Sequence, residues 1–65
     1  MSNDLKVLAE LELTVDQAWE LAQVLKRMTL MDYRLLTTDN EKAYDALNGG
    51  QCVIEALAKV GIDPR

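Results

Sequence analysis

The stretch that decides the fold is residues 13–28, LTVDQAWELAQVLKRM. Its apolar side chains recur at steps of three and four residues, which places them on one face of an α-helix. Those residues are Val15, Ala18, Leu21, Ala22, Leu25 and Met28. Thr14 and Gln17 have the spacing of a capping box, in which each side chain accepts from the other residue's backbone amide. The sequence therefore predicts a helix that begins after Thr14, and we expect Trp19 to make its largest packing contribution.

The residues before this helix alternate with a period of two. From residue 6 to residue 13, one face would carry Val7, Ala9, Leu11 and Leu13, and the other face Lys6, Leu8, Glu10 and Glu12. This period is typical of a half-buried β-strand, so we predict an N-terminal strand over residues 6–13. A lone strand leaves its backbone groups unpaired. Three partners remain open: the same strand of a second copy in a symmetric dimer, a different protein, or an extended segment over Tyr33–Thr38.

Two further helices are expected after a change of direction at Thr29. The apolar cluster that follows predicts a short helix over Met31–Leu36. Thr38 then begins the last helix, with Glu41 in the return position of a second capping box. The expected fold class is mainly α (α+β): one N-terminal strand, a long helix, a short helix and a C-terminal helix, packed as a single domain over residues 1–65.

The last helix contains the sequence Asn48-Gly49-Gly50. Each glycine costs about 1 kcal/mol relative to alanine inside a helix, but the helical spacing of apolar residues continues across it. We therefore predict one continuous helix, with two helices joined at the glycines as the alternative. Gly50 would also permit close backbone contact with the first helix. Gly61 is expected to end the helix in a left-handed conformation, and Pro64 to prevent its restart.

Composition narrows the classes of function. The chain has 11 acidic and 7 basic residues, a net charge of −4, no histidine and one cysteine. Without a basic stripe, direct binding to nucleic acid is disfavoured. A Cys/His zinc site is excluded, no cofactor is expected, and a lone cysteine fits a reducing cytoplasm. No stretch has the length of a signal peptide or a membrane span, so we expect a cytoplasmic protein.

No residue pattern predicts catalysis. General acid–base catalysis usually uses histidine, or carboxylates with shifted pKa values in a pocket. A nucleophilic Cys52 would need a base and an orienting group, and the sequence identifies neither. We expect Cys52 to be a small residue at a seam between helices, and we rank an enzyme that uses it last. The sequence predicts a protein that is not an enzyme.

Acidic residues provide the candidate contacts to a partner. Asp16 and Glu20 lie four residues apart, as do Glu41 and Asp45, and two more acids share the outer face of the predicted strand. The candidate partner-binding residues are Glu10, Glu12, Asp16, Glu20, Glu41 and Asp45. Rows of acids can imitate a nucleic-acid backbone toward a basic protein groove. The alternative is an ordinary solvated face, in which acids in the first turn are favoured by the helix dipole.

Several short segments between Val15 and Arg65 are shared with a known group of proteins. They are Ala18-Trp19, Leu25-Lys26-Arg27, Asp32-Tyr33-Arg34, Ala43-Tyr44 and Gly61 to Arg65. In these pieces the chain resembles a family of short uncharacterised proteins from Pseudomonas and related proteobacteria, some of them on phages and mobile elements. In size and acidity it is also similar to small phage anti-CRISPR proteins, in particular an inhibitor of the type I-C system.

The resemblance to anti-CRISPR proteins implies a function and a partner. It implies a non-enzymatic inhibitor that binds a basic groove of a type I-C Cascade surveillance complex and blocks target DNA. If the acidic residues make the contacts, the mechanism is DNA mimicry, without direct binding to nucleic acid or to a membrane. The alternative is a small homodimeric helical adaptor, or another protein-interaction module, that joins through the N-terminal strand.

Overall fold

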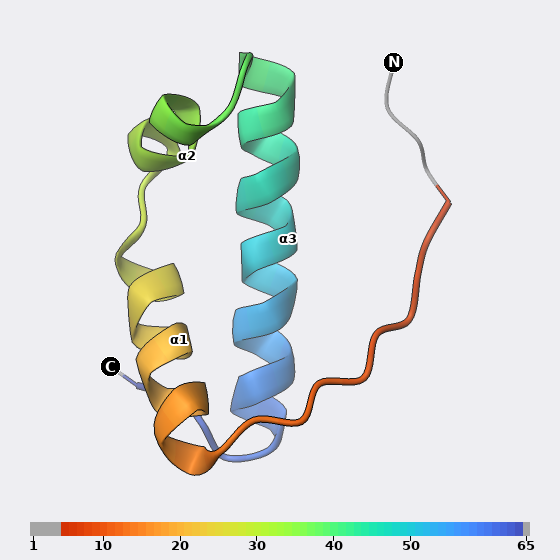
Figure 1. The fold of residues 1–65 in the computed structure, drawn as a ribbon, viewed down its shortest axis with the longest axis vertical. Coiled ribbons are helices and arrows are strands. Elements are labelled where there is room, and N and C mark those ends of the chain that lie inside the picture. The colour runs from red at the N-terminus through yellow and green to blue at the C-terminus, as the bar shows by residue number, and fades with distance from the viewer. Residues whose placement is uncertain (1–4, 65) are drawn as a thin grey trace.

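The computed structural model describes residues 5–64, which form three helices joined by short connections (Figure 1). They are α1 (Val15–Arg27), α2 (Leu30–Leu36) and α3 (Asn40–Lys59). α3 contacts both other helices. α1 runs antiparallel to α3 and packs beside its C-terminal half, whereas α2 packs beside its N-terminal half (Figure 1). The longest helix is therefore the element on which the other two are assembled.

Side-chain caps begin each helix. The predicted box at α1 is confirmed: the amide of Gln17 donates to Thr14 Oγ1 at 3.1 Å, and the amide of Thr14 donates to Gln17 Oε1 at 3.0 Å. α2 begins at Leu30, one residue before the predicted start, because Thr29 caps it. Its box is closed by Asp32, whose Oδ2 accepts from the amide of Thr29 at 2.8 Å.

The cap predicted for the last helix lies one residue too early. Asp39, not Thr38, is the cap, and its Oδ1 accepts from the amide of Lys42 at 2.9 Å. The hydroxyl of Thr37 donates to the carbonyl oxygen of Tyr33 at 2.7 Å, which closes the end of α2. With that end closed, the aspartate is placed to cap α3, and the predicted box between Thr38 and Glu41 is wrong.

The prediction of a single helix across the glycines is confirmed, since α3 continues without a break from Asn40 to Lys59. Gly50 is buried, whereas Gly49 is exposed. A Cβ atom added at Gly50 would lie 2.6 Å from the hydroxyl oxygen of Tyr33 and 3.6 Å from Cδ2 of Leu25. The close contact expected with the backbone of α1 is therefore made by side chains, chiefly from α2.

The C-terminal end of α3 also follows the prediction. Gly61 has a φ of 94°, its amide donates to the carbonyl of Ala58 at 3.0 Å, and the amide of Ile62 donates to the carbonyl of Leu57 at 2.9 Å. These two bonds form a Schellman motif. Ile62 packs on the core beside Leu57, which is the apolar contact that accompanies this motif.

After this motif the chain turns back onto α1. The ammonium group of Lys26 donates to Oδ1 of Asp63 at 2.7 Å and to the carbonyl oxygen of Pro64, which is buried. The side chain of Lys26 is one-third exposed and that of Asp63 nearly two-thirds, so the ion pair itself contributes little, roughly 0.2–1 kcal/mol. Its role is to hold the tail beside the end of α1.

The core is thin and contains many small residues. Ala18 and Ala22 of α1 pack with Leu57 of α3, and Val53 and Ile62 lie against them. Tyr33, Ala43 and Ile54 are the other buried apolar residues of the described chain. Trp19 is partly buried and lies outside this cluster, and its role as the largest packing contribution of α1 stays a prediction. Alanine side chains bring α1 close to α3.

The N-terminal strand predicted over residues 6–13 is absent, and the α+β fold class is therefore wrong. Residues 5–14 are extended but form no strand, and the part of the chain that the structure describes contains no sheet. The segment Tyr33–Thr38, considered as a partner, forms the end of α2 and a bend. The alternating pattern fails because it describes the segment alone, and none of residues 5–64 forms a neighbouring strand that could pair with it.

Gly50 provides a direct test of the contact between α2 and α3. We expect Gly50→Ala to lower the free energy of unfolding by about 1–3 kcal/mol relative to Gly49→Ala, because its methyl group would overlap the buried Tyr33. Gly49 is the matched control, because a Cβ atom there meets nothing within 4 Å. Gly49→Ala should stabilise the protein by up to about 1 kcal/mol through helix propensity. Urea denaturation measures both values.

A second substitution tests whether the hydroxyl oxygen of Tyr33 causes the loss of stability in Gly50→Ala. Tyr33→Phe removes the oxygen that lies nearest to the added methyl group, so it should recover most of the loss in a Gly50→Ala background. A double-mutant cycle over these two positions gives the coupling energy. Equal stability of the Gly50→Ala and Gly49→Ala proteins would show that Tyr33 does not pack on Gly50.

Candidate functional site

The most exposed apolar residues of the described chain lie before α1. We call residues 5–13 the N-terminal segment. The side chains of Leu5, Val7 and Leu8 are 85%, 89% and 105% exposed, and exposure falls to 37% at Leu13, where the segment joins α1. In Figure 1 the segment crosses the C-terminal end of α3 and continues along the side of α3 that α1 and α2 leave uncovered.

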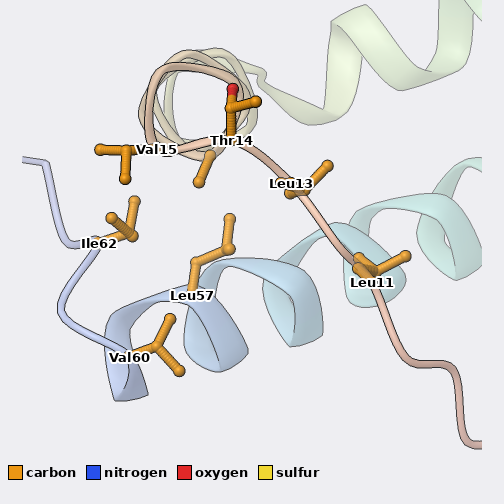
Figure 2. Close-up of a pocket in the computed structure, with 8 residues that line it drawn as sticks. Leu11, Leu13, Thr14, Val15, Leu57, Val60 and Ile62 are labelled. Carbon is orange, nitrogen blue, oxygen red and sulfur yellow. The ribbon is translucent and has the colours of Figure 1, made fainter.

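A hollow of about 250 Å³ lies where the segment meets the helices (Figure 2). Leu57 projects from α3 toward the start of α1, and Val60 and Ile62 lie beside it (Figure 2). The rest of the lining consists of Leu11 and Leu13 of the segment, together with Thr14, Val15 and Ala18. Apart from the Thr14 hydroxyl, which is part of the helix cap, these side chains are aliphatic.

A second hollow, of about 410 Å³, continues from the first along α3. We call it the apolar groove. Its wall on the segment consists of Val7, Leu8, Ala9 and Leu11. Its wall on α3 consists of Cys52, Val53, Ala56, Leu57 and Val60. Leu11, Leu57 and Val60 line both hollows, so the two form a continuous apolar surface that is open to solvent.

Cys52 lies on the surface rather than at a seam between helices, so the expectation for this residue is wrong. It precedes the buried Ile54 by two positions, which in a helix places the two side chains on nearly opposite faces. As a member of the α3 wall it is the single thiol of the apolar groove.

The six candidate acidic residues are all exposed, but they do not form one patch. Glu10 and Glu12 belong to the N-terminal segment, and Asp16 and Glu20 to the first turns of α1. Glu41 and Asp45 lie in the first turns of α3, at the opposite end of the molecule (Figure 1). Along α3, about 18 Å of helix separates Asp45 from Leu57. Because α1 and α3 are antiparallel, α1 begins beside Leu57 and therefore far from Asp45.

Sequence reasoning missed the outer face of α3. Val53, Ala56 and Val60 follow one another at steps of three and four, on a stripe that borders the core residue Leu57, and Val53 itself packs against the core. A helix with so wide an apolar face has more apolar surface than one neighbouring helix can cover, and this excess was the available signal.

The described residues show neither a metal cluster nor a membrane span. No group of three or more Cys, Asp or Glu side chains within the described chain is placed to hold a metal ion. None of the three helices is both long and apolar enough to cross a bilayer. Among the described residues, no polar or charged side chain is buried.

Two aspartate substitutions test whether the segment contributes to the fold. At low protein concentration, Leu8→Asp should change the free energy of unfolding by less than about 0.5 kcal/mol, because Leu8 is fully exposed. Leu57→Asp should unfold the protein, because it places an unpaired carboxylate in the core. Circular dichroism and urea denaturation measure the difference. A large loss of helix in Leu8→Asp would mean that the segment packs on the helices.

Comparison with known proteins identifies a family for this chain but no function for this surface. Neither the curated proteins nor the solved structures contain a match to the chain. A family model does match it over residues 1–65, and its description is a family of unknown function, DUF7706. The chain belongs to the DUF7706 family of unknown function.

Proposed function

We propose that this chain is a non-enzymatic protein-interaction module that binds another protein through the N-terminal segment and the apolar groove. The observation that carries the proposal is the near-complete exposure of Leu5, Val7 and Leu8 beside an apolar groove. Small monomeric proteins rarely leave a large continuous apolar patch in water, and such patches usually mark sites of association.

The energy available from covering this surface is sufficient for binding. Burying an exposed leucine or valine side chain stabilises a complex by roughly 1.5–3 kcal/mol. Three such residues of the segment, with the aliphatic wall of α3 facing them, provide several times that amount before the entropy of ordering the partners is subtracted. The chemistry of the groove also favours binding over catalysis, because its lining is aliphatic apart from the Cys52 thiol.

The test compares the proteins that the chain retains from a lysate of its source cells. The wild type should retain a partner that Leu8→Asp loses, because the carboxylate would have to be desolvated in the interface. Val24→Asp is the matched control: Val24 is 54% exposed on α1, lies outside both hollows, and receives the same charge. Equal retention by both variants would reject the segment as the docking surface.

A second candidate function follows from the acidic end of the molecule. Glu10, Glu12, Asp16 and Glu20 are exposed and lie within about ten residues of chain around the start of α1. We propose, as the resemblance to small phage anti-CRISPR proteins implies, that these acids bind a basic groove and keep target DNA out of it. The candidate target is a type I-C Cascade complex in the cytoplasm of the host bacterium.

Charge reversal distinguishes this candidate from the first. Asp16→Lys with Glu20→Lys should weaken binding to Cascade, and added salt should weaken binding of the wild type. The matched control is Glu41→Lys with Asp45→Lys, which makes the same change of charge at the other end of the molecule and should have little effect (Figure 1). A competition assay with labelled target DNA provides the measurement. Unchanged inhibition by the first double variant would reject DNA mimicry by this end.

A further inference from the structure

The apolar groove is an unfilled space between two walls of the same chain. The N-terminal segment forms one wall and the outer face of α3 forms the other. The segment does not fill the space itself, since Val7 and Leu8 remain almost wholly exposed. An additional apolar segment of extended chain, placed between the walls, would cover both of them at once.

We propose that the occupant is the N-terminal segment of a second copy of this chain, so that two copies associate around a two-fold axis. This inference rests on the proposed interaction-module function and names its partner. Each segment would lie between the α3 and the segment of the other copy. The order across the interface is then α3, segment, segment, α3. Because each chain contains both the groove and the segment that fits it, a two-fold axis forms every contact twice.

The charges and the apolar residues along the segment together favour this antiparallel arrangement and one register. If Leu8 of one copy lies opposite Leu8 of the other, Lys6 lies opposite Glu10 twice, and Val7 lies opposite Ala9. Opposite charges and apolar pairs in these positions stabilise adjacent extended chains. The register with Val7 on the axis places Lys6 opposite Leu8. The register with Ala9 on the axis places Lys6 opposite Glu12, but it also places Leu8 opposite Glu10. The proposal therefore assigns Leu8 to the two-fold axis.

The segment is long enough for a specific interface. Its nine residues have a mass of about 1,000 Da, and an extended chain exposes roughly 1.45 Å² per dalton, which gives about 1,500 Å². Burying half of this surface, with the groove wall that faces it, brings each copy close to the roughly 800 Å² per partner of a standard interface. Because each copy carries a net charge of −4, added salt should screen the repulsion between the two copies and tighten the dimer.

Sedimentation velocity over the micromolar range tests the association. The wild type should change from monomer to dimer as its concentration rises. Leu8→Asp should raise the dissociation constant by about tenfold or more, because it places two carboxylates together on the axis. Val24→Asp adds the same charge outside the groove and should leave the dissociation constant unchanged within about twofold.

A charge swap tests the register. Lys6→Glu and Glu10→Lys should each weaken the dimer, because each puts like charges opposite one another at two symmetric positions. The two substitutions together restore opposite charges and should restore the dissociation constant to within a few-fold of the wild type. Failure of the double variant to recover, with both single variants weakened, would overturn the assigned register. No recovery of this kind is expected from binding to a different protein.

Cys52 reports whether the groove is covered. It is the only cysteine and lies on the α3 wall, so its rate of alkylation under reducing conditions should fall as the dimer forms. The rate should fall in the wild type and in Val24→Asp, and stay independent of concentration in Leu8→Asp.

A wild type that remains monomeric at submillimolar concentration, with a constant alkylation rate, would overturn self-association. With a monomeric wild type, loss of the cellular partner by Leu8→Asp would still support the interaction module. Retention of that partner by Leu8→Asp would contradict both proposals.

Discussion

Every contact between helices in the described chain passes through α3. α1 and α2 both pack on this helix and do not pack on each other. Each contact depends on a small residue: Ala18 and Ala22 bring α1 close to Leu57, and Gly50 accommodates the ring of Tyr33. Small residues allow close approach but bury little apolar area, and a domain of this size buries only about 60% of its unfolded surface. The fold therefore depends on one helix and a thin core.

Hydrogen bonds at the ends of the helices add stability that the small core does not provide. A side-chain cap stabilises a helix by about 0.5–2 kcal/mol, and all three helices have one. The Schellman motif at Gly61 ends α3 and turns the chain back, where Lys26 holds the tail beside α1. These contacts are local or nearly so, and they are well suited to a chain in which few residues are available for long-range packing.

The position of the candidate surface follows from this architecture. α1 and α2 both lie along one side of α3 (Figure 1), and Cys52, Ala56 and Val60 of the groove wall stay exposed. The N-terminal segment forms the other wall without filling the space. The apolar residues that the core does not accommodate are thus concentrated beside a single open groove. This is the physical basis on which we propose that the protein works by association.

Local rules were sufficient to predict much of the fold from the sequence. The cap at Thr14, the left-handed Gly61 and the unbroken helix over residues 40–59 depend only on residues within one or two turns of each other. Only the tertiary structure decided which surfaces meet. It brought Tyr33 to Gly50, separated Glu41 and Asp45 from the other acids, placed Cys52 on the surface and left residues 6–13 without a strand to pair with. Helix spacing is a property of neighbours along the chain, whereas contacts across space depend on which helix faces which and in what direction it runs.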